Sequence, residues 1–169
     1  MKKNMIPDSI FMQVEKPARY TGNEINMVVK DPKKVDVRFG FCFPDVYEVG
    51  MSHLGLQILY FFLNRREDTY CERVFAPWID LEKIMREKNI PLFSLETQES
   101  IKNFDFLGFT LQYEMSYTNI FNMLDLGGIP IFSKDRSEDD PIIVCGGSCA
   151  YNPEPLAEMV DFFYMGEGE

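Results

Sequence analysis

The sequence predicts an α/β fold with a parallel sheet that carries helices on both faces. Short apolar runs alternate about five times with longer segments of helical character along the 169 residues. Most of these runs are apolar throughout, which is typical of strands buried on both faces of a parallel sheet. The length is also close to that of one domain.

The elements follow from local patterns. Residues 1–34 contain Pro7, Pro17 and Pro32 without sustained periodicity, and we expect an N-terminal arm with at most a short helix. The α/β domain is expected to span residues 35–169. We expect strands at 35–43, 71–76, 104–111, 141–145 and 161–165, and short extended pieces at 92–95 and 129–132. We expect helices at 51–64, with Ser52 as the N-cap, at 79–88, at 117–126 and at 155–160.

Composition excludes several classes of protein. There are 17 Lys and Arg against 27 Asp and Glu, a net charge of −10, so no nucleic-acid-binding surface is predicted. The longest uninterrupted apolar run, residues 58–63, is far shorter than the ~20 residues that span a bilayer. Pro7 and Asp8 interrupt any signal peptide. We therefore expect a cytoplasmic protein with no membrane partner.

Few residues are candidates for chemistry. Cys145 and Cys149 could ligate a metal, but structural zinc and iron–sulfur sites use more ligands, so we favour a glycine-rich ligand loop with incidental thiols. His53, the single histidine, excludes a multi-histidine site and is better explained as structural. Glu96 and Glu114 are candidate bases, although solvated or capping roles are better supported.

Ligands bind such sheets outside the carboxyl ends of the strands. This rule selects residues 44–50, 112–116, 146–148 and 166–169, three of which contain glycines that let a ligand approach the backbone. None contains a Gly-x-Gly-x-x-Gly fingerprint or a Walker phosphate loop. The residues alone predict a ligand-binding α/β domain, and no catalytic arrangement is visible.

Four stretches add a resemblance: residues 16–31 (KPARYTGNEINMVVKD), 43–60 (FPDVYEVGMSHLGLQILY), 104–131 and 144–169, which contains GG, NPEP and GEGE. Together they resemble the N-terminal domain of a family of uncharacterised radical S-adenosylmethionine (radical SAM) proteins. The resemblance implies a flavodoxin-like fold of the kind that binds cobalamin.

In the family that this resemblance indicates, a radical SAM barrel follows the GEGE stretch. Its Cys-x-x-x-Cys-x-x-Cys motif holds a [4Fe–4S] cluster that cleaves S-adenosylmethionine. This sequence has no such triplet, and Cys145 and Cys149 precede GEGE, so we do not assign them to the cluster. We expect the barrel after residue 169 as the partner of this domain, acting on an unknown substrate. We expect this chain alone to be non-catalytic.

Cobalamin binding stays open at this point. Proteins with a histidine ligand to cobalt carry Asp-x-His-x-x-Gly in the first strand-to-helix loop. Here Asp45 and Gly50 match, Tyr47 replaces the histidine, and His53 is out of register. A neutral phenol, with a pKa of about 10, is a poor ligand. Either cobalamin binds without a protein ligand below cobalt, or the fold has lost the cofactor.

The interpretation is thus a cobalamin-binding-like front domain that binds a cofactor, a substrate or a partner. The alternative is a non-catalytic interaction module that docks a protein or an RNA-processing partner. A flavodoxin-like FMN protein is a weaker third option, because the first loop lacks a Ser/Thr-rich phosphate cradle. The expected cofactor-binding residues are Pro44, Asp45, Tyr47, Glu48, Gln112, Tyr113, Gly146, Gly147, Ser148, Gly166 and Glu167.

Overall fold

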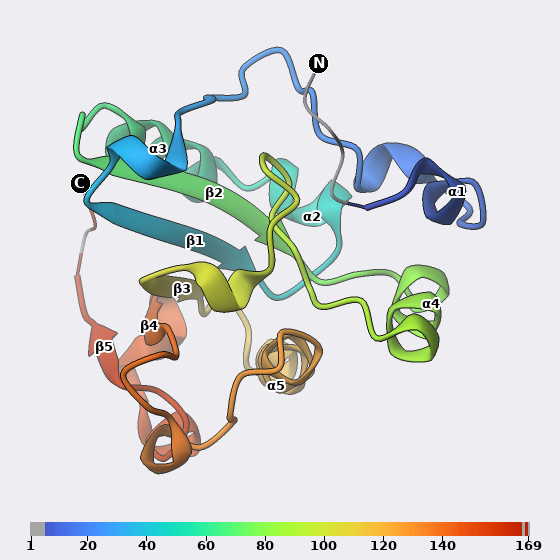
Figure 1. The fold of residues 1–169 in the computed structure, drawn as a ribbon. Helices are drawn as coiled ribbons and strands as arrows, with labels where there is room; N and C mark the ends of the chain where they lie inside the picture. Colours follow the sequence, from blue (N-terminus) through green and yellow to red (C-terminus); the bar gives the residue numbers. More distant parts are fainter. Residues whose placement is uncertain (1–5, 167, 169) are drawn as a thin grey trace.

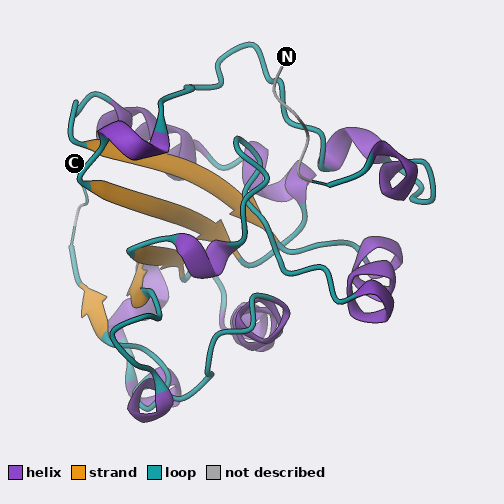
Figure 2. Ribbon diagram, viewed as in Figure 1, coloured by secondary structure: helices purple, strands orange, loops and turns teal. Residues whose placement is uncertain are grey.

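The computed structural model of the chain describes residues 6–166 and 168. Its centre is a five-stranded, all-parallel sheet with the strand order β2-β1-β3-β4-β5 (Figures 1 and 2). The strands are β1 (Val37–Phe43), β2 (Thr69–Phe75), β3 (Phe106–Thr110), β4 (Ile142–Gly146) and β5 (Phe162–Tyr164). This order is the flavodoxin-like one, and it confirms the predicted fold class.

Five α-helices accompany the sheet in the described part of the chain. They are α1 (Asp8–Phe11), α2 (Tyr47–Met51), α3 (Leu54–Asn64), α4 (Ile79–Lys88) and α5 (Tyr117–Leu126). The bounds of α4 and α5 are those predicted. The helix expected at 155–160 is instead a short 3-10 turn, Glu154–Leu156. Among the described residues, no helix is long and apolar enough to cross a bilayer.

The predicted helix at 51–64 is broken. Helix α2 ends at Met51, and α3 begins only at Leu54. Ser52 was expected to cap this helix, and that prediction is wrong. His53 is the N-cap, because its Nδ1 accepts a hydrogen bond of 3.0 Å from the backbone N–H of Leu56. The imidazole satisfies one of the donors that every helix N-terminus leaves unpaired.

The strand order determines which helix covers which face. The connection from β1 to β2 runs in one direction along the sheet, and the connections from β2 to β3 and from β3 to β4 run in the other. Right-handed crossovers therefore place α3 on one face and α4 and α5 on the opposite face (Figure 1). The core follows this division, with one apolar cluster on each face.

The larger cluster lies under α4 and α5. It includes Cys42, Leu107, Phe109, Ile143 and Cys145 from the sheet. The N-terminal arm enters the same cluster through its apolar side chains, and the ring of Phe11 meets that of Phe93 edge-on at 6.4 Å. Residue 34 therefore marks no boundary in the hydrophobic core.

The face under α3 is covered unevenly. Helix α3 packs on β1 and β2, with Leu56 and Tyr60 fully buried against that part of the sheet. On β5, in contrast, Phe162 and Tyr164 are 47% and 51% exposed. A parallel sheet is normally buried on both faces, so this uncovered part is the unusual feature of the fold.

Strand β2 lies at one edge of the sheet, and buried charges tie the segment 92–100 against it. The guanidinium of Arg73 is fully buried and bonds Glu96 Oε1 through Nε at 2.7 Å. Glu96 Oε2 also accepts the backbone N–H of Arg73 at 2.7 Å. These bonds occupy part of the edge that an unprotected strand would offer to another chain.

A second buried ion pair lies on the other face of β2. Arg38 bonds the fully buried Glu72 at 2.7 Å, and Glu72 also accepts hydrogen bonds from Ser94 and Thr97. The whole cluster holds two cations and four carboxylates: Arg38, Arg73, Glu24, Glu72, Glu96 and Glu99. Acid therefore exceeds base around these buried groups.

Burial governs the titration of Glu96. Burial raises the pKa of Glu96 to about 7, and the attraction of Arg73 offsets the burial only in part. The proximity of Glu72 raises the pKa further. The expectation that Glu96 is a solvated or capping residue is therefore wrong: it is a buried partner of Arg73.

We predict that stability falls as pH rises from about 4.5 to about 7. The folded state binds the Glu96 proton more tightly than the unfolded chain, so the contribution of this proton is present near pH 4.5 and lost by about pH 7. The loss is at most about 3 kcal/mol. Urea unfolding at pH 5.5 and 7.5 measures it. Glu96→Gln should flatten the difference, whereas the exposed control Glu138→Gln should keep it; equal pH dependence in all three proteins would contradict the assignment.

Candidate functional site

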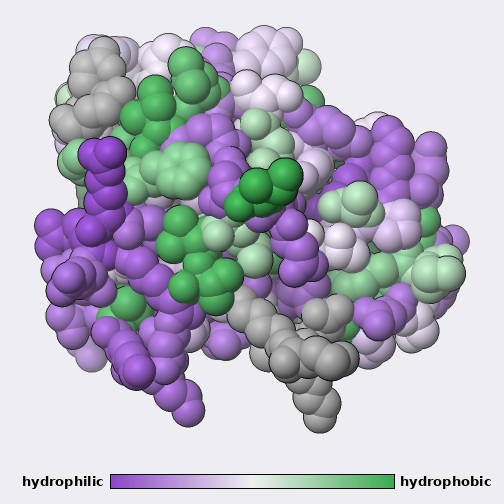
Figure 3. All heavy atoms as spheres, turned by 90° about the horizontal axis from the view of Figure 1, so that it is seen from above, coloured by the Kyte–Doolittle hydropathy of each residue, from purple (hydrophilic) through white to green (hydrophobic). Residues whose placement is uncertain are grey.

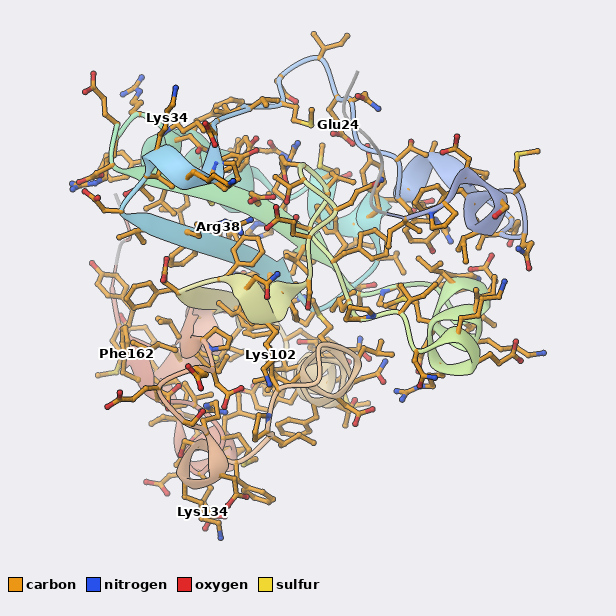
Figure 4. The ribbon with its side chains drawn as sticks, in the orientation of Figure 1. Glu24, Lys34, Arg38, Lys102, Lys134 and Phe162 are labelled. Carbon is orange, nitrogen blue, oxygen red and sulfur yellow. The ribbon has the colours of Figure 1, made fainter. Side chains whose placement is uncertain are left out.

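A cleft of about 570 Å³ lies where the sheet is uncovered. The sheet forms its floor, α3 forms one wall, and Gly166 and Gly168 border it after β5. Phe162, on the terminal strand, lies at the edge of the molecule (Figure 4). The floor residues share one face of the sheet and are Val37, Phe39, Phe41, Phe106, Gly108, Thr110, Val144, Gly146, Phe162 and Tyr164.

The floor follows from the period-2 alternation of the strands. Residues two apart in a strand share a face, so Phe106, Gly108 and Thr110 all line the cleft. Glycine at position 108 is required by a close approach: a Cβ there would lie 2.4 Å from Cζ of Phe39. At Gly146, a Cβ would meet only ordinary contacts, the nearest at 3.6 Å. That glycine therefore leaves space in the cleft.

The wall is the inner side of α3. Leu59, Phe62 and Leu63 line the cleft, and His53 and Gly55 lie at the N-terminal end of the helix. Helix α3 is apolar nearly all round, and Phe62 remains 46% exposed. Seen from above, the surface of the molecule shows several apolar patches between hydrophilic residues (Figure 3).

At the strand ends, the loops after β3 and β4 are tied together. The N–H of Leu111 donates to the carbonyl of Gly146 at 2.6 Å, and the carbonyl of Leu111 accepts the N–H of Cys149 at 3.0 Å. Gly147 has φ of 101°, which disfavours any other residue. A Cβ there would also lie 2.9 Å from the side chain of Gln112. This crossing fixes the mouth of the cleft.

The structure divides the predicted site residues into two groups. Gln112, Gly146, Gly147 and Gly166 line the cleft. The cleft lining does not include Tyr113, which is 61% exposed, or Ser148, whose hydroxyl lies 3.5 Å from the carbonyl of Leu111. Glu167 lies outside the described residues.

The strand-to-helix loop after β1 makes its contacts outside the cleft. Pro44 offers its carbonyl to Asn119 on α5, and Asp45 caps the N–H of Val46 at 2.7 Å. Glu48 is held by Arg19 of the N-terminal arm at 2.9 Å. None of these side chains lines the cleft.

Tyr47 also turns toward the arm. Its hydroxyl donates to Glu24 at 3.1 Å, and its ring meets Phe75 edge-on at 5.5 Å. Burial and the nearby charge of Glu24 raise the pKa of Tyr47. The phenol is thus a protonated hydrogen-bond donor in a structural contact, which makes it a poor metal ligand.

Cys145 points away from the cleft. Its side chain belongs to the core cluster under α4 and α5, and burial raises the pKa of its thiol to about 12. Cys149 is half-buried and packs against the same cluster. Within residues 6–166 and 168, no group of three or more His, Cys, Asp or Glu side chains could hold a metal ion.

Sequence reasoning missed the apolar part of the site. The cleft is lined by Phe39, Phe106, Phe162 and Tyr164, although an aromatic residue in a strand is normally buried in the core. The available signal was a bulky apolar residue followed two positions later by glycine, Phe106 and Gly108 in β3 and Val144 and Gly146 in β4. Its meaning depends on which face lacks a helix, and only the strand order determines that.

Comparison with known proteins now gives the family. Residues 55–169 match the model of the N-terminal region of radical SAM proteins. The chain belongs to this family. An uncharacterised protein of Methanocaldococcus jannaschii is 30% identical over 130 residues, which cover 75% of this chain and 23% of that protein. The chain thus spans about a quarter of that relative's length. No solved structure gives a significant match.

We predict that the N-terminal cap of α3 stabilises the wall of the cleft. His53→Ala should lower the free energy of unfolding by about 1 kcal/mol, because the N–H of Leu56 loses its acceptor. His53→Asn, which restores an acceptor, is the matched control and should recover most of the loss. Urea unfolding of the three proteins measures this. Equal stability of the alanine variant and the parent would show that the cap contributes nothing.

Proposed function

We propose that this radical SAM family domain binds cobalamin at the strand-end mouth of its cleft and leaves catalysis to the rest of the longer protein. The observation that carries the proposal is the open cleft. Its volume, about 570 Å³, lies within the range of small-molecule sites, roughly 300–1,000 Å³. A fold kept without a ligand would be expected to fill this space with side chains, since protein interiors are close-packed.

The residues at the mouth suit an extended planar ligand with polar edges. Gly146 and Gly147 expose backbone where β4 ends, and Gln112 supplies an amide beside them. The aromatic floor, with Phe39 stacked on Phe106 at 6.3 Å, offers flat apolar surface to the part of a ligand that enters the cleft. We propose Gln112, Gly146, Gly147 and Gly166 as the residues that hold cobalamin.

Neither the hydroxyl of Tyr47 nor a ring nitrogen of His53 is free to coordinate cobalt. Tyr47 is occupied by Glu24, and Nδ1 of His53 accepts the N–H of Leu56. A neutral imidazole whose Nδ1 is an acceptor carries its proton on Nε2, so neither nitrogen offers a lone pair to a metal. Cobalamin would therefore bind without a protein ligand below cobalt. When bound, it would supply a carrier of alkyl groups.

The [4Fe–4S] cluster and S-adenosylmethionine need a binding site outside this chain. The sequence contains no Cys-x-x-x-Cys-x-x-Cys triplet. We propose that the [4Fe–4S] cluster and S-adenosylmethionine bind in the remainder of the longer family proteins, where the substrate is converted.

One observation favours the second candidate, an interaction module without cofactor. Leu54, Ile58, Phe61 and Phe62 on α3 are 39–71% exposed, which is a large apolar surface for one helix. Under this alternative, the chain docks a protein partner through α3. Cobalamin titration distinguishes the two candidates, because an interaction module should not bind it.

We predict saturable binding of hydroxocobalamin and methylcobalamin, with the spectrum of cobalamin whose lower base has left cobalt. Gly146→Leu should weaken binding by about tenfold or more, because its side chain projects from the floor into the cleft. Ile142→Val, on the same strand outside the cleft lining, is the control and should bind normally. Anaerobic absorbance titration and calorimetry measure this. No binding at millimolar cobalamin by a folded chain would favour the interaction module.

A further inference from the structure

We propose that the uncovered sheet face is the docking site of an amphipathic helix. This helix belongs to the same polypeptide in the longer family proteins and is formed by the residues that follow the GEGE stretch. We name this surface the open face and define it by Phe106, Val144, Phe162 and Tyr164 on the sheet and by Leu59 and Phe62 on α3. The inference does not depend on cobalamin.

The first argument is the cost of leaving such a face in water. Phe162, Tyr164 and Phe62 are 47%, 51% and 46% exposed, although strands of this kind are normally buried on both faces. Burying side chains of this size is favourable relative to leaving them in water. The opposite face of β3 and β4 is covered by α4 and α5, so the missing layer lies on one side only.

The second argument is the path of the chain after β5. Gly166 and Gly168 both line the cleft, so the segment leaves β5 along the open face. A Cβ on Gly168 would lie 2.9 Å from Cδ2 of Leu59, which places this backbone against α3. Residues that follow would therefore begin inside the groove.

The third argument concerns the source of the helix. The family is defined as the N-terminal region of radical SAM proteins, and this chain covers 23% of the M. jannaschii relative. A segment already held against α3 has a high effective concentration at the groove, which a second copy or a separate partner lacks. The covering helix is therefore best supplied in cis.

The groove also defines the chemistry of its occupant. It is lined mainly by aromatic and aliphatic side chains. Such a groove takes a helix with one apolar stripe at the i, i+3/i+4, i+7 spacing and a polar outer face. Because Tyr164 pairs in register with Gly146, the docked helix would border the strand-end mouth, and a ligand at Gly147 would bind beside it.

The test compares this chain with one extended after Glu169 by the roughly 30 residues that follow the aligned domain in the M. jannaschii relative, enough for a turn and a helix of five turns. Both carry Cys149→Ser and Tyr164→Cys, and the remaining native cysteines are buried. We expect maleimide to label position 164 at least tenfold more slowly in the extended chain. Met12→Cys in place of Tyr164→Cys, at a residue that is 81% exposed in the arm, should react equally fast in both.

A stability cycle provides the second readout. Phe162→Glu should lower the Tm of the extended chain by roughly 3–8 °C and leave that of the 169-residue chain nearly unchanged, because Phe162 is half-exposed there. Unchanged labelling, or equal effects of Phe162→Glu in both chains, would overturn the proposal, as would protection that appears only with dimerisation. All measurements omit cobalamin, so failure of helix docking and failure of cobalamin binding are separate results.

Discussion

A parallel sheet must be covered on both faces, and the rest of this structure depends on how that requirement is met. Two helices bury one face, and α3 buries β1 and β2 on the other. In the described part of the chain, no helix covers the rest of that face, and its aromatic side chains leave a cleft open. The same feature therefore creates the candidate ligand cleft and the apolar surface that needs a partner.

The N-terminal arm packs beside β2, the strand at the edge of the sheet. Glu24 of the arm forms an ion pair with Arg73 and accepts a hydrogen bond from the hydroxyl of Tyr47. Arg19 of the arm bonds the carboxylate of Glu48. These contacts place the first strand-to-helix loop in the structural framework. The loop that most resembles a cobalamin motif in sequence is thus used for packing, whereas the loops after β3 and β4 form the mouth of the cleft.

The fold was predictable because its information is local. Apolar runs and helical periods gave every strand and the bounds of α4 and α5. Ser52 failed as a cap because the side chain that accepts the Leu56 N–H is an imidazole, which capping preferences rank low. Glu96 failed as a solvated residue because its partner, Arg73, lies on a distant strand. Four residues of the site, Gln112, Gly146, Gly147 and Gly166, followed from the strand-end rule; the aromatic floor did not, because it depends on which face lacks a helix.

The cleft and the loop position where a histidine ligand to cobalt would stand are different places in the structure. A histidine ligand would have to stand at Tyr47, whose hydroxyl is bonded to Glu24 and whose ring packs on Phe75. Tyr47 does not line the cleft, which extends along β1, β3, β4 and β5 beside α3. The tyrosine at this position therefore leaves the cleft unfilled. A ligand held by glycine backbone, Gln112 and aromatic surface needs no metal ligand from the protein, so the tyrosine does not argue against a bound cofactor.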